Sequence, residues 1–249
     1  MTRKSVVFAV LGAFFLTNAL VAEMIGGKLI YVGDPSWRFG PFGSIPEIGP
    51  FQMSVGIIPW PVVFLTTDLI NEYFGRRGVR RLTFLTVAMI AYAFVILAVT
   101  RLPEATPLGV DGDSFDKVFG QSQWIIVGSV TAFLASQLLD VFVFQWLRRF
   151  TGKSMLWLRA TGSTVVSQMI DSVIVLYIGL ALPMHWDWST FIATAIPNYT
   201  VKLVLAVLAT PLIYLGHWIV EKYLGKEAAE EIAASAARNE SDGVKSAGS

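Results

Sequence analysis

Six long apolar runs are the feature of this sequence that most restricts what the chain can fold into. Each approaches the roughly 20 residues that an α-helix needs to cross the hydrocarbon core of a bilayer. The runs lie near residues 5–25, 53–72, 82–100, 122–147, 160–182 and 191–219. Apolar residues make up 54% of the chain and charged residues only 15%, whereas soluble domains carry about 25% charged residues. The sequence therefore predicts an all-α integral membrane protein, a bundle of six transmembrane helices.

The two ends of the chain fit this organisation. The first apolar run is longer than the roughly 7–15 residues of a signal-peptide core and has no clear small-residue cleavage site, so we interpret it as a retained helix. We assign residues 1–220 to the transmembrane domain and residues 221–249 to a cytoplasmic tail. Glu, Lys and Ala give way to Ser and Gly along the tail, which predicts a part that is helical and then a part that is disordered.

Lysines and arginines in short loops predict how the helices are oriented, because they concentrate on the cytoplasmic side. Such residues cluster at the N-terminus, in the segments 76–81 and 148–159, and in the tail. Few occur in the segments 31–52 and 101–121. Both termini and the segments 76–81 and 148–159 are therefore predicted to be cytoplasmic, and the segments 31–52 and 101–121 are predicted to face outward. The segment 31–52 is rich in Gly and Pro and is predicted to be an external loop or a short re-entrant hairpin.

Polar residues within the apolar runs are the main functional signal. An ionisable side chain at mid-bilayer costs on the order of 2.5–3.5 kcal/mol on insertion scales, so such residues usually serve a purpose. The candidates for substrate binding are Asn18, Glu23, Asp68, Asn71, Glu72, Gln137, Asp140, Gln168, Asp171, Asn198 and Lys202. Five of them are acids and one is a lysine, so internal ion pairs cannot satisfy them all. Some acids are expected to face a watery cavity, to be protonated or to meet a ligand.

Several of these candidates also have a purely structural interpretation. Asp68 and Glu72 are close enough to the arginines of the segment 76–81 to form ion pairs at the membrane boundary. Asp140 has an arginine two turns further on. Asp171 has no basic residue within one turn, which favours a binding role. Lys202 is interpreted as a counter-ion for one of the aspartates, as a charge that ligand binding reorganises, or as both.

A short repeat links two of the predicted helices. Ser136-Gln137-Leu138-Leu139-Asp140 and Ser167-Gln168-Met169-Ile170-Asp171 share the pattern S-Q-x-x-D. A short loop joins their helices, which must then run antiparallel, so the two motifs approach one another from opposite directions. At about 1.5 Å per residue, Asp140, Asp171 and Asp68 lie at similar depths. We predict that the polar candidates converge on one cavity in the cytoplasmic half of the bilayer, and inverted-repeat symmetry is suggested.

The stretch TTDLINEYFGRRGVRR, residues 66–81, carries a family resemblance. On a helix, Asp68, Asn71 and Glu72 share one face, because they are three and four residues apart. The stretch resembles the queuosine precursor transporter family, small six-helix membrane proteins also described as vitamin-uptake-like. The matching positions are Asp68, Glu72, Gly75, Arg76 and Arg77, then Ser167, Gln168 and Asp171, and then Asn18 and Lys28. Glu23 has no assigned counterpart in that pattern.

The resemblance implies a multi-pass protein of the bacterial inner membrane. It would import 7-cyano-7-deazaguanine or 7-aminomethyl-7-deazaguanine, bases used to make the tRNA nucleoside queuosine. A guanine-type edge presents neighbouring N–H and NH₂ donors, which a carboxylate can accept as a pair. Gln and Asn side chains suit the neighbouring oxygen and ring nitrogens. The substrate follows from the resemblance, whereas the residues alone indicate a small-molecule transporter.

Other classes of protein are less well supported by the residues. The chain has no cysteine, its two histidines stand alone, and its formal charge is +1. These features argue against disulfides, metal sites, cofactors and nucleic-acid partners. An intramembrane aspartyl protease would use paired aspartates. Its Gly-x-Gly-Asp segment is absent from the apolar runs, so we predict no catalytic residues and no enzyme.

Two questions about partners stay open at this stage. The chain contains no G-x-x-x-x-G-K-[ST] motif, so any use of ATP would require another chain. One alternative is therefore a substrate-binding membrane subunit of a vitamin-type importer that is driven by separate ATPase partners. The other is a self-sufficient carrier coupled to protons or sodium, and a homodimer is compatible with either.

Overall fold

The computed structural model describes residues 2–26, 28–31, 52–120, 123–151 and 155–245. Almost all of its elements are helical, and the 3₁₀ turn η1 and the π-helical turn η2 are short. In chain order the elements are α1 (Arg3–Ile25), β1 (Leu29–Tyr31), β2 (Gln52–Ser54), η1 (Val55–Ile57), α2 (Trp60–Thr100), α3 (Gly112–Phe119), α4 (Gln123–Thr151), α5 (Leu156–Leu176), η2 (Tyr177–Ala181), α6 (Trp188–Leu224) and α7 (Lys226–Lys245).

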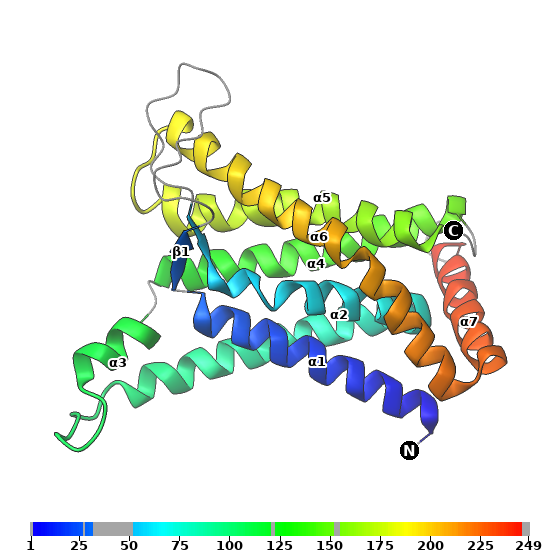
Figure 1. Ribbon diagram of the computed structural model, residues 1–249, viewed down its shortest axis with the longest axis horizontal. Helices are drawn as coiled ribbons and strands as arrows, with labels where there is room; N and C mark the ends of the chain where they lie inside the picture. The colour runs from blue at the N-terminus through cyan, green and yellow to red at the C-terminus, as the bar shows by residue number, and fades with distance from the viewer. Residues whose placement is uncertain (1, 27, 32–51, 121–122, 152–154, 246–249) are drawn as a thin grey trace.

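Five helical segments in the described part of the chain are long and apolar enough to cross a membrane. They contain α1, α2, α4, α5 and α6, which lie side by side along the long axis of the molecule (Figure 1). The expectation of a helical membrane protein is therefore confirmed. A short antiparallel pair of strands, β1 and β2, joins the end of α1 to the start of α2. Most of the segment 31–52, predicted to be an external loop, lies outside the described residues.

Two of the six predicted helices belong to one continuous element, α2. Residues 76–81, predicted to be a connecting loop, are helical, and that prediction is wrong. The element has 41 residues, which at 1.5 Å per residue gives about 60 Å, twice the thickness of a hydrocarbon core. Its helical geometry is broken at Gly75, where φ is 68° and ψ is −176°. Only glycine adopts such a backbone readily, because it has no Cβ.

Figure 1 shows what the break at Gly75 does to α2. The chain runs toward the right-hand end of the view, turns back, and continues in the opposite direction toward α3. The two predicted helices therefore form two arms of a helical hairpin. The turn lies beside the start of α1, where the rings of Phe8 and Phe74 have centroids 4.9 Å apart.

The remaining predicted helices are present, but they begin or end at different residues than predicted. The helices α4 and α5 extend into the predicted loop 148–159, so that their connection is short. The predicted outward segment 101–121 contains α3, where the N–H of Ser114 bonds to the Asp111 carboxylate at 2.8 Å and lowers the pKa of that carboxyl. The helix α6 ends at Leu224, so the predicted tail boundary at residue 221 falls within it.

The tail contains the helix that the sequence predicted, and this helix is packed against the bundle. Gly225, with φ of 88°, makes the turn between α6 and α7. Ala229 is buried, and it belongs to the same hydrophobic cluster as residues of α1, α2 and α4. The helix α7 therefore lies across one end of the molecule (Figure 1). Residues 246–249, predicted to be disordered, lie outside the described part.

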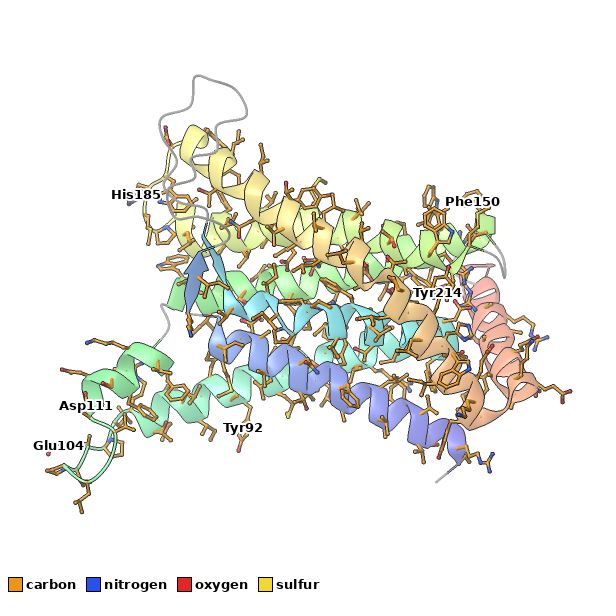
Figure 2. The ribbon with its side chains drawn as sticks, viewed as in Figure 1. Tyr92, Glu104, Asp111, Phe150, His185 and Tyr214 are labelled. Carbon is orange, nitrogen blue, oxygen red and sulfur yellow. The ribbon has the colours of Figure 1, made fainter. Side chains whose placement is uncertain are left out.

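Apolar side chains occupy both the interior and the outer surface of the bundle. Phe15, Val63 and Phe133 have no more than 1% of their surface exposed and form part of the central cluster. Large apolar and aromatic side chains also face outward, including Tyr92 and Phe150, which project from the ribbon in Figure 2. A surface of this kind suits contact with lipid rather than water. Buried polar side chains therefore stand out against this apolar interior.

Candidate functional site

The helix α4 carries a row of polar side chains along its length. From Ser129 to Arg148 these side chains contact polar groups on α1, α2, α5 and α7. The distance along the helix is about 28 Å at 1.5 Å per residue, close to the roughly 30 Å of a hydrocarbon core. We call this row, its partners and the buried Gln168 beside Ser167 in α5 the polar tract. Its members are Glu23, Thr67, Asp68, Asn71, Glu72, Ser129, Ser136, Gln137, Asp140, Gln145, Arg148, Arg159, Ser167, Gln168, Asp171 and Lys202.

At the end nearest β1 and β2, the tract begins with Glu23. This side chain is buried, and its carboxylate accepts a hydrogen bond from the Ser129 hydroxyl. Glu23 also interacts electrostatically with Asp171 and Lys202. Lys202 forms an ion pair with Asp171 that joins α6 to α5. Asp171 therefore has a basic partner, although none lies near it in the sequence, and Lys202 has the counter-ion role that was one of its two interpretations.

In the middle of the tract, the two S-Q-x-x-D motifs bond to one another reciprocally. The Ser136 hydroxyl donates to Asp171 Oδ1 at 3.3 Å, and the Ser167 hydroxyl donates to Asp140 Oδ1 at 3.1 Å. The serine of each motif thus holds the aspartate of the other, as antiparallel helices allow. All four side chains are at most 5% exposed.

Both glutamines of the repeat are also buried, each with 2% of its surface exposed. The Thr67 hydroxyl of α2 lies 3.3 Å from Gln137 Oε1 and donates to it. This contact ties the first arm of α2 to α4. Gln168 lies one residue beyond Ser167, next to the reciprocal pair in the sequence of α5.

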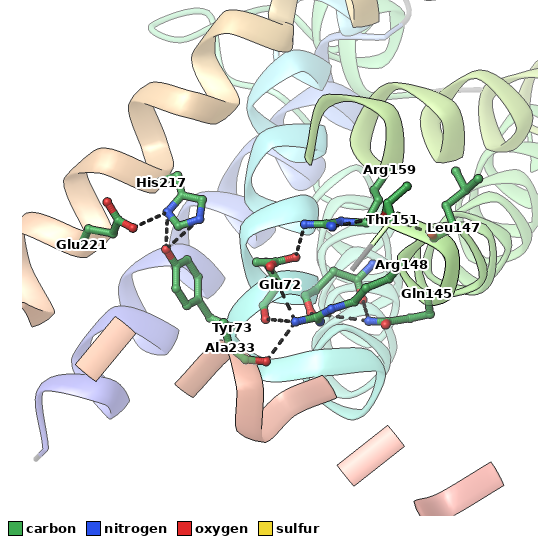
Figure 3. A network of polar contacts seen from close by, with 11 residues as sticks. Glu72, Tyr73, Gln145, Leu147, Arg148, Thr151, Arg159, His217, Glu221 and Ala233 are labelled. Carbon is green, nitrogen blue, oxygen red and sulfur yellow. Dashed lines mark hydrogen bonds and ion pairs between the residues drawn. The ribbon is translucent and has the colours of Figure 1, made fainter. Parts of the chain in front are cut away.

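At the other end of the tract, Glu72 lies between two arginines (Figure 3). Arg159 Nη2 is 3.1 Å from Glu72 Oε2, and Arg148 Nη2 is 3.6 Å from Oε1. The neighbouring Asn71 accepts a hydrogen bond at Oδ1 from Gln145 at 3.1 Å. Three helices, α2, α4 and α5, therefore meet at this acid. Its arginine partners are those of α4 and α5, whereas the sequence interpretation had considered only the arginines of the segment 76–81.

The tail helix takes part in the same network. Arg148 Nη2 donates to the backbone carbonyl of Ala233 in α7 at 2.9 Å, and the same guanidinium reaches the backbone carbonyls of Asn71 and Glu72 at 3.4 Å. One side chain thus connects α4, α2 and α7. A separate contact lies nearby, where Tyr73 Oη and His217 Nδ1 are 2.5 Å apart.

Asp68 occupies a different position from the other acids. It is 2% exposed, and its Oδ1 has no hydrogen-bond partner among the described residues. It lines a small pocket of about 10 Å³ between α2, α5 and α6. The other lining residues are apolar or threonine: Phe64, Leu65, Ala160, Thr161, Thr164, Ala206, Ala209 and Ile213. Among the acids of the tract, Asp68 therefore has a carboxylate oxygen that could bind a ligand in this pocket.

Nine of the eleven predicted binding residues belong to the polar tract, and two lie apart from it. Asn18 donates to the carbonyl of Phe14, and Asn198 donates to the carbonyl of Thr194. Each of these bonds is a local contact to the residue one turn earlier in the same helix. Within the described hydrogen bonds, neither asparagine contacts another predicted residue.

The sequence interpretation missed two arginines that are central to the tract. It placed Arg148 and Arg159 in the segment that connects two helices, whereas both residues are helical. Arg159 lies in α5 and is 1% exposed, with its guanidinium also 5.7 Å from the ring centroid of Phe144. The signal for Arg159 was the apolar sequence on both sides of it, Leu-Trp-Leu before and Ala-Thr-Gly after. An arginine in such surroundings needs an acid partner in the interior.

Comparisons with known proteins identify the family. Residues 54–216 match the family described as "putative vitamin uptake transporter". The chain belongs to this family. Among similar proteins is the "probable queuosine precursor transporter" of Bacillus subtilis (strain 168), 29% identical over 169 residues, 68% of this chain and 73% of the relative. The protein of the same name from Haemophilus influenzae (strain ATCC 51907 / DSM 11121 / KW20 / Rd) is 25% identical over 167 residues, 64% of this chain and 65% of the relative.

No solved structure matches this chain. The family assignment confirms the resemblance to queuosine precursor transporters that was inferred from the sequence motifs. It also confirms that the protein is a multi-pass membrane transporter and not an enzyme.

Proposed function

We propose that this transporter imports queuosine precursors, 7-cyano-7-deazaguanine or 7-aminomethyl-7-deazaguanine, into the cytoplasm of a bacterial cell. The observation that carries the proposal is the polar tract, a membrane-thick row of buried hydrogen-bonding groups inside an apolar bundle. Ionisable groups in such a setting are costly and usually mark a substrate or ion path. The names of the two relatives supply the substrate class.

The pocket beside Asp68 is the proposed place where the ligand is held. It offers apolar walls for a flat ring and a carboxyl group for the polar edge of that ring. Its volume of about 10 Å³ has room for about one water molecule, far less than a ring-shaped ligand occupies. Ligand entry therefore requires α6 to move away from α2 and α5. Asp140, Gln168 and the unpartnered amide nitrogen of Asn71 are the further polar groups proposed to serve the ligand.

We assign the remaining acids of the tract to holding and adjusting the helices. Glu72 fixes the end of the tract near α7 through Arg148 and Arg159. The pair of Asp171 with Lys202 joins α5 to α6, one of the helices that line the pocket. Ligand binding is proposed to reorganise this second pair when α6 moves. Glu23 lies at the opposite end of the tract and is proposed to line the entry path.

The proposed topology has six membrane crossings and both termini in the cytoplasm. The two arms of α2 supply two of the crossings, since the chain reverses at Gly75. Four exposed arginines follow this turn: Arg76, Arg77, Arg80 and Arg81. Positive charge of this density is typical of the cytoplasmic side. The helix α7, which lies at the same end of the molecule, would then cover the cytoplasmic end of the tract.

Complementation of a precursor-deficient cell tests the proposed substrate. Cells that cannot make the deazaguanine should recover queuosine in their tRNA when this protein is expressed and 7-cyano-7-deazaguanine is supplied at low concentration. The matched variant Glu104→Gln, at an exposed position outside the helices, should complement equally well. Unmodified tRNA in cells whose membranes contain the protein would refute the substrate assignment.

Purified protein in liposomes tests whether the transporter acts alone. Uptake of the labelled base without any other chain supports a self-sufficient carrier. Binding without uptake supports a substrate-binding subunit that depends on separate ATPase partners. We favour the carrier, because the tract extends through the whole thickness of this one chain.

A further inference from the structure

The buried charges of the polar tract do not balance. Among the described residues, the buried acids of the membrane-spanning helices are Glu23, Asp68, Glu72, Asp140 and Asp171. The cations that pair with them inside the bundle are Arg148, Arg159 and Lys202. Five acids against three cations leave a surplus of two negative charges if every acid is ionised. An uncompensated charge is costly in a medium of low polarity, so protons are the simplest way to remove the surplus.

The contacts of each acid show how strongly its ionised form is stabilised, and therefore which acid is most readily protonated. Glu72 faces two arginines, and Asp171 is paired with Lys202, so both are stabilised as anions. Asp140 and Glu23 each accept a hydrogen bond from a serine hydroxyl, which offsets part of the cost of burying the ionised form. Asp68 is the exception, because its Oδ1 has no hydrogen-bond donor among the described residues.

The groups around Asp68 favour the same conclusion. From α2 and α4 it faces the acids Glu72 and Asp140, and from α5 it faces Arg159, which is already paired with Glu72. From α6 the pocket is lined by Ala206, Ala209 and Ile213, none of which carries a charge. Two like charges and one shared cation do not compensate an ionised carboxylate at this position.

We propose that Asp68 holds a proton when it binds the ligand, so that one proton enters the cell with each imported molecule. This inference rests on the proposed function and adds the coupling ion to it. The proton bonds to an Asp68 oxygen from the outward side and leaves to the cytoplasm after the ligand, and the O–H bond is the only covalent bond that forms or breaks. The proton gradient then drives accumulation without ATP.

The chemistry of a protonated carboxyl group suits the ligand. A carboxylic acid presents one O–H donor beside one carbonyl acceptor. The ring edge of a guanine-type base likewise presents one N–H donor beside one carbonyl oxygen. The two edges pair through two parallel hydrogen bonds, and both partners are neutral. An asparagine side chain offers the same combination of donor and acceptor, whereas an ionised carboxylate offers acceptors only.

This equivalence defines the experiment. Purified parent protein, Asp68→Asn and the control Asp113→Asn, at an exposed position in α3, are placed in liposomes. Two assays use labelled 7-cyano-7-deazaguanine: exchange against unlabelled base without a gradient, and net accumulation with the outside made more acidic. With one proton per ligand, a gradient of about one pH unit should sustain roughly tenfold accumulation in the parent and the control. Asp68→Asn should lose the accumulation, because its amide carries no proton that can be released to the cytoplasm.

A second measurement does not depend on a variant. Adding the base to the parent protein in weakly buffered detergent solution at mildly alkaline pH should remove protons from the solution, because binding requires the acid form. A pH-indicator dye reports this uptake directly. It applies even if Asp68→Asn fails to fold.

The outcomes separate the inference from the proposed function. Accumulation by Asp68→Asn, or binding to the parent without proton uptake, would overturn the inference and leave import of the base intact. Loss of exchange in a folded Asp68→Asn would also overturn it, because the residue would then bind as an anion. A parent that neither binds nor exchanges the base would overturn the proposed function, and the inference with it.

Discussion

Replacing Glu72 by glutamine should destabilise the transporter more than replacing either of its arginine partners. The carboxylate lies 3.1 Å from Arg159 Nη2 and 3.6 Å from Arg148 Nη2, and Arg159 is 1% exposed. In Glu72→Gln both guanidinium groups lose this charged partner at once. Removing one partner of a buried ion pair costs about 3–5 kcal/mol, and we expect a loss in this range.

Replacing the partner Arg159 instead should cost less free energy of unfolding, because Glu72 keeps Arg148 as a partner. In Arg159→Met the carboxylate still faces Arg148, so the main loss is one hydrogen bond to a charged group. Such a bond contributes about 1.5–3 kcal/mol. Methionine fills much of the space beside Phe144 that the arginine side chain occupied.

Equilibrium unfolding in mixed detergent micelles measures both effects, and the double variant measures their coupling. If the two residues form one unit, Glu72→Gln combined with Arg159→Met should be more stable than the sum of the single losses by on the order of 0.5–3 kcal/mol. Additive losses, or a larger loss for Arg159→Met than for Glu72→Gln, would refute the buried network as described. The control Asp113→Asn should unfold like the parent, since this carboxylate is exposed.

Three further predictions concern the membrane, the helix packing and the ligand. In this cysteine-free chain, Arg77→Cys should react with an impermeant thiol reagent only after the cells are opened, and Glu104→Cys should react in intact cells; the opposite pattern would invert the proposed topology. Gly128→Ala should cost about 1–3 kcal/mol of stability, because its Cβ would lie 2.8 Å from the backbone of η2. Gly109→Ala, with nothing within 4 Å, should unfold like the parent. Asp171→Asn should weaken precursor binding roughly ten- to hundredfold in a direct binding assay, because it loses the charge-assisted bond to Lys202 that joins α5 to the pocket helix α6; unchanged affinity in a folded variant would refute a link between this pair and the ligand.

The sequence predicted the class of fold well because a bilayer limits the choice so strongly. Backbone groups in hydrocarbon must be satisfied within helices, so apolar runs of sufficient length indicate where the helices lie. The error at residues 76–81 has a physical cause. Four arginines suggested a loop in water, but arginine is a good helix former, and the single glycine at position 75 was enough to reverse the chain.

The candidate site was predictable only in part. Intramembrane acids are visible in a sequence because they are rare and costly there. Their partners are harder to find, because partners come from helices that are distant in the chain. Asp171 and Lys202 are 31 residues apart, and Glu72 and Arg159 are 87 residues apart. Nothing in the local pattern around Glu72 favoured Arg159 over the four arginines that follow it within three turns.

The S-Q-x-x-D repeat shows which part of a site local spacing can predict. On two antiparallel helices in contact, each step forward along one helix is matched by an equal step backward along the other. Gly128 of α4 lies close to Gly179 of η2, which continues α5. Eight residues further along α4 and eight back along α5 lie Ser136 and Asp171, and four more steps bring Asp140 opposite Ser167.

Because serine precedes aspartate by four residues in both motifs, one reciprocal bond requires the other. A slip of α4 against α5 by a single residue would move both serines away from both aspartates at once. The four-residue spacing therefore fixes the register of α4 against α5 in the polar middle of the tract. Replacing Ser136 and Ser167 together by alanine should consequently weaken the packing of α4 on α5, besides changing the surroundings of Asp140 and Asp171.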